Sequence, residues 1–129
     1  MEHIPNRDTP ILIVDDDTGF LLTIKEILVS SGMPEPALVS DPRRVMPLVE
    51  THGFQLVLLD LIMPHLSGMA VLEQIKQRFY HTECVMITAS DDIGSAVEAM
   101  KLGAYDYLTK PVQYEKLIIL VQRALERYC

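Results

Sequence analysis

Residues 55–68 read QLVLLDLIMPHLSG, a short apolar run that ends in Asp60 and continues into a stretch typical of a loop. An apolar strand with a terminal carboxylate delivers that charge to the edge of a sheet, which packing alone explains poorly. A second acidic group repeats the pattern, since Asp15, Asp16 and Asp17 follow the apolar residues 11–14. If the two strands are parallel neighbours, these carboxylates converge, and like charges that close need a cation to stay ionised.

Short β-branched runs alternate with longer amphipathic stretches along the chain, which is typical of βαβ units and a parallel sheet covered on both faces. The helical spacing of apolar residues supports amphipathic helices between the runs. We therefore predict an α/β fold with a five-stranded parallel sheet and helices on both faces. The expected strands lie near residues 10–15, 36–40, 55–60, 83–88 and 104–109.

Turn and cap residues agree with this division. Ser31-Gly32 ends the first helix, and Asp41-Pro42 supplies an N-cap acceptor and a proline at the first position of the second helix. Pro47 should kink or shorten that second helix. The first nine residues are polar enough to be loose, so we expect an N-terminal extension over 1–9 and one domain over 10–129.

The composition limits the classes of function. The chain has 129 residues and a net charge of −7, from 11 basic and 18 acidic residues, which argues against nucleic-acid binding through phosphate neutralisation. Its two cysteines, Cys84 and Cys129, form no disulfide framework and are typical of a reducing compartment. No apolar run is long enough for a membrane span or a secretory leader, so the expected location is the cytoplasm.

Ligands of open parallel sheets collect beyond the carboxyl ends of the strands. The motifs at those ends are Val14-Asp15-Asp16, Leu59-Asp60-Leu61-Ile62-Met63-Pro64 with Gly68, Ile87-Thr88-Ala89, and Tyr107-Leu108-Thr109-Lys110-Pro111. Over nearly the whole chain this set resembles the receiver domain of two-component response regulators. Within that family, residues 99–111 are most similar to the NtrC type of transcription activator. The resemblance implies a flavodoxin-like (βα)5 fold with strand order 2-1-3-4-5.

The chemistry of these residues can be stated without the family. Asp60 is a carboxylate nucleophile that could accept a phosphoryl group and store it as a mixed anhydride. Asp16, with help from Asp15, suits a hard divalent cation such as Mg²⁺ or Mn²⁺ that bridges to phosphoryl oxygens. Lys110 supplies a positive charge for a phosphoryl oxygen, and Thr88 supplies a hydroxyl that can move toward the phosphate.

The resemblance adds further roles. It implies that the backbone carbonyl of Ile62 is a metal ligand, that the peptide between Lys110 and Pro111 is cis, and that Tyr107 turns inward or outward together with Thr88. Phosphorylation would then rearrange the face made by the fourth helix, fifth strand and fifth helix. The implied partners are a sensor histidine kinase and an output domain or partner protein, with transcription controlled through domains absent from this chain. Such a chain is a regulatory switch rather than an enzyme, and catalyses only its own phosphorylation and dephosphorylation.

Two local patterns carry additional expectations. Residues 117–121 are five consecutive apolar residues, which cover the whole circumference of a helix, so Ile119 or Leu120 should face outward and contribute to a homodimer or interdomain contact. Ile62 is apolar where some receivers carry a polar group that positions the attacking water, and Ser90 is small and neutral. We therefore hypothesise a long-lived phosphoryl state.

Other interpretations of the same residues stay open. An acidic triplet before Thr18 would by itself most often be a helix cap. A stand-alone receiver would act through protein–protein contacts, and a degenerate receiver would bind partners without phosphorylation. An aspartate-nucleophile phosphatase needs an acidic group two residues after the nucleophile, where Ile62 stands. A flavodoxin-like cofactor binder needs hydroxyls and amides in its first loop, where Asp15, Asp16 and Asp17 stand.

Overall fold

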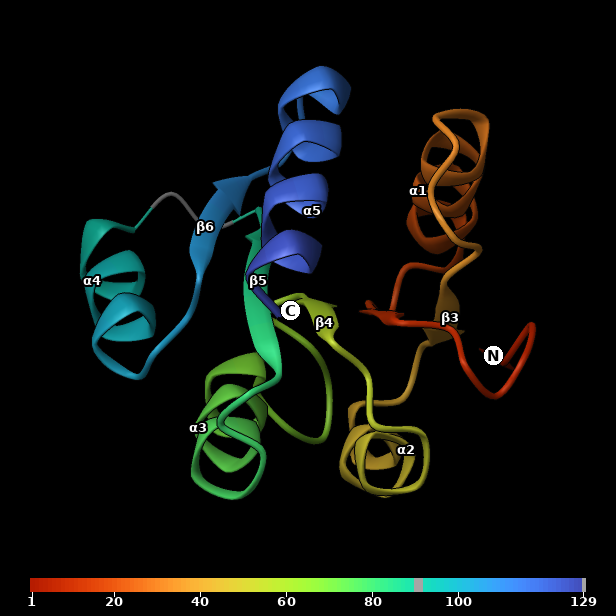
Figure 1. Ribbon diagram of the computed structural model, residues 1–129. Helices are drawn as coiled ribbons and strands as arrows, with labels where there is room; N and C mark the ends of the chain where they lie inside the picture. Colours follow the sequence, from red (N-terminus) through yellow and green to blue (C-terminus); the bar gives the residue numbers. More distant parts are fainter. Residues whose placement is uncertain (90–91, 129) are drawn as a thin grey trace.

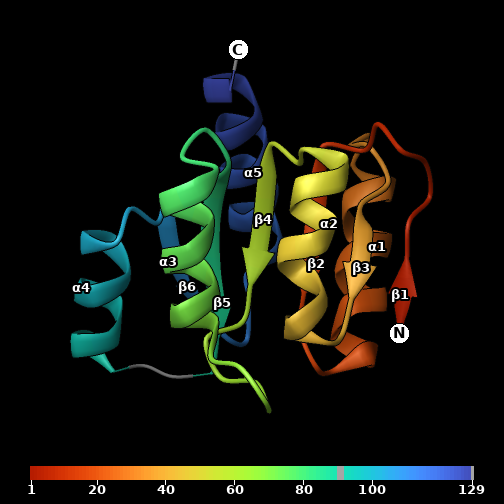
Figure 2. The same ribbon diagram turned by 90° about the horizontal axis from the view of Figure 1, so that it is seen from below.

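The computed structural model describes residues 1–89 and 92–128, which form one sheet with helices on both faces (Figure 1, Figure 2). The strands are β1 (Glu2–His3), β2 (Ile11–Val14), β3 (Ala37–Val39), β4 (Leu56–Leu59), β5 (Glu83–Thr88) and β6 (Asp106–Thr109). The helices are α1 (Thr18–Ser30), α2 (Val45–His52), α3 (Gly68–Arg78), α4 (Ile93–Lys101) and α5 (Tyr114–Tyr128), with a 3₁₀ helix, η1, at Pro42–Arg44.

The strand order is β1-β3-β2-β4-β5-β6, and all neighbours from β3 to β6 are parallel. Without β1 this is the predicted order 2-1-3-4-5, so the predicted fold is confirmed. Strands β2 and β4 contain only buried apolar residues, because helices cover both faces of the sheet. The parallel arrangement brings the carboxyl ends of β2, β4, β5 and β6 to one edge, where the predicted site residues lie.

Two apolar clusters fill the space between the sheet and its helices. Figure 1 shows α1 and α5 on one face and α2 and α3 on the other. Cys84 and Met86 of β5 belong to the cluster that packs against α2, α3 and α4. Val85 and Ile87 of β5 belong to the cluster that packs against α1 and α5. Because side chains alternate along a strand, Thr88 lies on the same face as Cys84 and Met86.

Strand β1 is the main difference from the expected fold. Glu2 and His3 pair antiparallel with Val39 and Leu38 of β3, and the amide of Ser40 donates to the carbonyl of Met1 at 2.9 Å. The five predicted parallel strands are therefore joined by a sixth, short antiparallel strand, and Glu2 and His3 are not loose as expected. The physical reason is that β3 would otherwise be the outermost strand of the sheet. The backbone groups on its outer side would then have no strand partners.

The helix boundaries follow the expected signals, with one change around Pro47. Asp41 caps η1 by accepting a hydrogen bond from the amide of Arg43. The chain then continues as α2 from Val45, so Pro47 occupies the first turn of α2. An amide in the first turn has no partner within its own helix, which explains why proline is tolerated there. The second helix is therefore shortened as expected, because the helical segment is divided into η1 and the eight-residue α2.

Helix α5 shows which of its apolar residues face the core. Leu120 is 7% exposed and packs with Leu117 and Val121, whereas Ile119 is 49% exposed. The expectation that Ile119 or Leu120 faces outward is therefore met by Ile119, while Leu120 belongs to the core.

Cys84 is buried as a free thiol in β5, and Cys129 lies outside the described residues. Among residues 1–89 and 92–128, no helix has both the length and the apolar character needed to cross a membrane.

Candidate functional site

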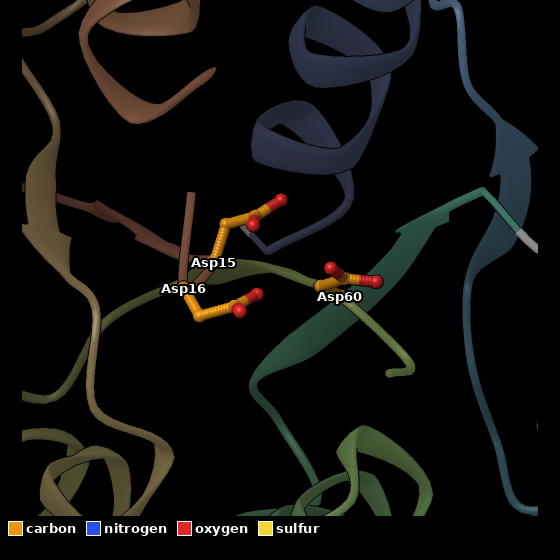
Figure 3. Close-up of side chains that lie close together, drawn as sticks. All are labelled: Asp15, Asp16 and Asp60. Carbon is orange, nitrogen blue, oxygen red and sulfur yellow. The ribbon is translucent and has the colours of Figure 1, made fainter. Parts of the chain in front are cut away.

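Three carboxylates meet at the carboxyl edge of the sheet. Val14 of β2 is aligned with Leu59 of β4, so Asp15 and Asp60 follow as neighbours at the ends of adjacent strands. Figure 3 shows Asp15 and Asp16 extending toward Asp60 from the end of β2. One oxygen from each of the three carboxylates lies within 4.8 Å of the others. This cluster could hold a metal ion, as the sequence predicts.

The acidic triplet divides into two roles. Asp15 and Asp16 contribute to the carboxylate cluster, whereas Asp17 is the N-cap of α1 and accepts a hydrogen bond from the amide of Phe20 at 3.2 Å. The cap interpretation of the triplet therefore holds for its last member only. Asp15 also accepts from the amide of Asp17 at 2.9 Å, so the start of α1 is tied to the site.

Lys110 brings a positive charge to the carboxylates. Its Nζ lies 2.7 Å from an oxygen of Asp15 and 3.7 Å from an oxygen of Asp60. The backbone amide of Lys110 donates to the carbonyl of Thr88 at 2.8 Å, which fixes the end of β6 beside β5. The peptide between Lys110 and Pro111 is cis, so that expectation is confirmed.

The electrostatics of the site favour an added cation. The pKa of Asp15 is raised above its ordinary value, chiefly because burial disfavours the carboxylate, and the charge of Asp60 acts in the same direction. The pKa of Lys110 is also raised: burial opposes its charge, but the hydrogen bond and the charge of Asp15 outweigh that effect. With Asp16 included, three carboxylates face one ammonium, so a divalent cation would balance the excess negative charge.

The loop after Asp60 is held against the end of β4. The amide of Ile62 donates to Oδ1 of Asp60 at 3.2 Å, while the Ile62 side chain is 63% exposed. Gly68, the first residue of α3, donates its amide to the carbonyl of Leu61 at 2.8 Å. A Cβ at Gly68 would overlap the carbonyl oxygen of Asp60. Gly68 belongs to the sequence motif that follows Asp60, but only the structure reveals this steric requirement.

Thr88 and Tyr107 lie on the face of the sheet that carries α4. Thr88 is fully buried at the end of β5. Tyr107 of β6 is aligned with Met86 of β5, is half-buried, and packs against the cluster that contains Ala99 of α4. The two residues therefore belong to neighbouring strands and share one face, which is the arrangement that a linked movement needs.

Sequence reasoning missed one residue of the site. Phe20 lies in the first turns of α1, and its ring packs against the core on the α1 and α5 side. The ring centroid also lies 4.1 Å from Nζ of Lys110. No local pattern could have revealed this contact, because it joins residues that lie 90 positions apart in the chain (110 − 20).

Comparisons with known proteins agree with this geometry. The sequence profile of the response regulator receiver domain matches residues 11–122. The DNA-binding transcriptional regulator NtrC of Klebsiella pneumoniae is 34% identical over 116 residues, which are 90% of this chain and 24% of that protein. The transcriptional regulatory protein ZraR of Escherichia coli is 35% identical over 115 residues, 89% of this chain and 26% of that protein. The chain thus spans about a quarter of the length of these curated relatives.

Solved structures share the fold. The receiver domain of NtrX from Brucella abortus superimposes with a TM-score of 0.83 at 33% identity, over 90% of this chain and 98% of that one. A CheY-like receiver domain protein from Methanospirillum hungatei superimposes with a TM-score of 0.85 at 29% identity, over 92% of this chain and 94% of that one.

Proposed function

This chain belongs to the receiver domains of response regulators, in the NtrC-type subclass, and from that premise we propose that Asp60 accepts a phosphoryl group from the phosphohistidine of a sensor kinase. The carboxylate oxygen of Asp60 would form a bond to phosphorus as the bond from phosphorus to the donor imidazole nitrogen breaks. Receiver domains are regulatory switches. We propose that the chemistry of this one is limited to its own phosphorylation and dephosphorylation.

The proposed cation is Mg²⁺ or Mn²⁺. Asp15, Asp16, Asp60 and the backbone carbonyl of Ile62 would hold it, in keeping with the all-oxygen ligands that hard divalent ions prefer. A divalent ion bound there supplies charge neutralisation for the incoming phosphoryl oxygens. Asp15 also keeps Nζ of Lys110 at the site, so that the ammonium can bind a phosphoryl oxygen on Asp60.

One observation carries this proposal. Nζ of Lys110 lies within 4 Å of carboxylate oxygens of both Asp15 and Asp60, at 2.7 Å and 3.7 Å, inside a cluster with the composition of a metal site. A nucleophile, a cation site and a fixed positive charge are the three parts that phosphoryl transfer to a carboxylate requires.

Thr88 and Tyr107 are the proposed switch. A phosphoryl group on Asp60 would attract the hydroxyl of Thr88, and the space vacated on the α4 face of the sheet would let Tyr107 turn inward. Such a change is a shift between two packings that a new local charge favours. The surface of α4, β6 and α5 would change with it.

The wider role follows from the relatives and stays a proposal. The NtrC proteins that resemble this chain are described as DNA-binding transcriptional regulators, so we propose that this receiver controls transcription in the cytoplasm through an output domain or partner protein. The receiver region would cover residues 10–129. A role that depends only on protein–protein contacts by the receiver is the alternative.

Incubation with a small-molecule phosphodonor, with and without Mg²⁺, tests the central proposal by intact mass. Wild-type protein should gain the mass of one phosphoryl group only when Mg²⁺ is present, and Asp60→Asn should gain none. Asp17→Asn is the matched control, because Asp17 caps α1 and asparagine also serves as an N-cap. A mass gain in Asp60→Asn equal to that of the wild type would overturn the assignment of the nucleophile.

Two further points depend on Ile62. Its apolar, 63% exposed side chain offers no acid or base to an attacking water, which disfavours the phosphatase alternative and supports a long-lived phosphoryl group. Ser90, the other residue in the lifetime hypothesis, lies outside the described residues. Loss of label from Asp60 within seconds would contradict the hypothesis, and turnover of a generic phosphoester would restore the phosphatase.

A further inference from the structure

The half-buried ring of Phe20, near the start of α1, lies directly against the ammonium of Lys110. The ring centroid is 4.1 Å from Nζ, within the range of a cation–π contact. We infer that Phe20 is a positioning residue, whose ring holds Lys110 in the place from which the ammonium meets a phosphoryl group on Asp60. This inference rests on the proposed function.

The surroundings of Nζ show what the ring contributes. An ammonium has three N–H donors. One is directed to Asp15 at 2.7 Å, and the oxygen of Asp60 at 3.7 Å is too far for a second strong hydrogen bond. The ring of Phe20 occupies another side of the ammonium. The direction toward Asp60 is thus left for an oxygen of the phosphoryl group.

A phenyl ring suits this place better than a polar group does. A carboxylate there would add a competing partner for Nζ and further negative charge beside the nucleophile. A water would have to be displaced, and would screen the attraction between the ammonium and the phosphoryl oxygens. The face of the ring attracts the cation without offering a hydrogen-bond acceptor that rivals phosphate.

The position of the ring is fixed by its own helix. The amide of Phe20 donates to the N-cap Asp17, whose amide in turn donates to Asp15, so the ring and the partner of Lys110 are held by the same turn. The ring also packs against the core on the α1 and α5 side. The helix start therefore fixes the backbone of Phe20 relative to Asp15, and packing against the core holds the ring.

Phe20→Leu and Phe20→Tyr test the inference, with Phe79→Leu as a matched control. Phe79 is also half-buried and also lies near a cation, since the guanidinium of Arg78 is 5.2 Å from its ring centroid, but it belongs to the end of α3. The rate of Asp60 labelling by a small phosphodonor at saturating Mg²⁺ should fall about three- to tenfold in Phe20→Leu. Phe20→Tyr, which keeps the ring face, should stay within about twofold of the wild type. Phe79→Leu should label at the wild-type rate.

Nuclear magnetic resonance supplies a readout that does not depend on phosphorylation. The ring current of Phe20 should shift the ε-methylene protons of Lys110 upfield in the wild type and in Phe20→Tyr, and the shift should vanish in Phe20→Leu. Wild-type protein without this shift would overturn the inference, and this result does not depend on whether Phe20→Leu folds. Labelling of Phe20→Leu at the wild-type rate would also overturn it. Failure of the wild type to be labelled would instead overturn the proposed function, and the Lys110 resonance would still decide whether the ring holds the ammonium.

Discussion

Gly68 at the start of α3 lies against the backbone of Asp60, so closely that a Cβ on Gly68 would overlap the carbonyl oxygen of Asp60. The helix that follows the loop therefore begins in contact with the end of β4. Any side chain at position 68 would push the helix and the nucleophile apart.

Gly68→Ala should therefore damage both stability and function. We expect the free energy of unfolding to fall by about 2 kcal/mol or more, since the methyl group meets backbone that cannot move aside cheaply. Labelling of Asp60 by a phosphodonor should be slower as well. Chemical denaturation and intact mass measure the two effects.

Gly19→Ala is the control for this substitution. Gly19 is exposed in the first turn of α1, and its added Cβ would meet only the side chain of Asp17, at 3.3 Å. If the Gly68→Ala protein is as stable as the Gly19→Ala protein, the backbone of Asp60 and Leu61 can make space for a Cβ at position 68, and the expected clash is absent.

Lys110→Met should slow the labelling of Asp60 by about 100-fold, because the fixed charge beside the phosphoryl oxygens is lost. Lys76→Met is a matched control. Lys76 is also a poorly exposed lysine in an ion pair, with Glu83 at 3.5 Å, but it lies at the opposite edge of the sheet. It should lose stability and keep its labelling rate, as measured by the time course of intact mass. Equal rates in the two variants would argue against a role for the Lys110 charge.

The thermal stabilisation by Mg²⁺ should depend on pH. Burial raises the pKa of Asp15 above 3.8, so between 3.8 and the raised value the folded protein holds a proton that the unfolded chain has lost. The metal-free protein therefore loses stability as the pH rises through this window. Mg²⁺ must displace the same proton, so its binding weakens as the pH falls through the raised pKa.

Melting curves at neutral pH and at the lowest pH at which the protein stays folded measure this effect. A concentration of Mg²⁺ about 100 times its Kd adds about 3 kcal/mol of stability, and the gain should be smaller at the lower pH. Asp16→Asn removes a proposed ligand and should reduce the gain at both pH values. An equal gain at both pH values in the wild type would exclude Asp15 as a metal ligand that must lose its proton.

Ile119 and Leu120 should separate surface from core effects. Ile119→Ser should leave the free energy of unfolding within about 0.5 kcal/mol of the wild type and weaken self-association of the phosphoryl-mimic state, because Ile119 is 49% exposed. Leu120→Ala should lower the stability by about 2 kcal/mol or more, since Leu120 is 7% exposed. Sedimentation with and without beryllofluoride, used here as the phosphoryl mimic, measures the self-association. A wild-type monomer at high concentration under both conditions would count against a dimer formed by this segment.

Much of the site could be predicted because a simple rule governs it. Parallel strands end at one edge of the sheet, so Asp15, Asp60, Thr88 and Lys110 were placed together by their positions after apolar runs. What could not be predicted depends on contacts between distant residues. The ring of Phe20 beside Lys110 is one such contact.

The inward position of Leu120 and the pairing of β1 have the same origin. Five consecutive apolar residues give no periodicity, so only the packing of α5 on the sheet distinguishes Leu120 from Ile119. Likewise, Glu2 and His3 carry no strand signal of their own. They are ordered because the edge of β3 needs a partner.

The pairing of β1 with β3 bears on where this domain should be considered to start. The receiver profile begins at residue 11, whereas the sheet begins at Glu2, and Arg44 next to α2 also binds Glu2 at 3.0 Å. A protein shortened to the matched region would leave the outer side of β3 without its strand partner at Leu38 and Val39. Exposed strands of this kind recruit other chains. Glu2 and His3 thus cover the outer side of β3, and we expect their removal to lower the solubility of the protein before it changes the labelling of Asp60.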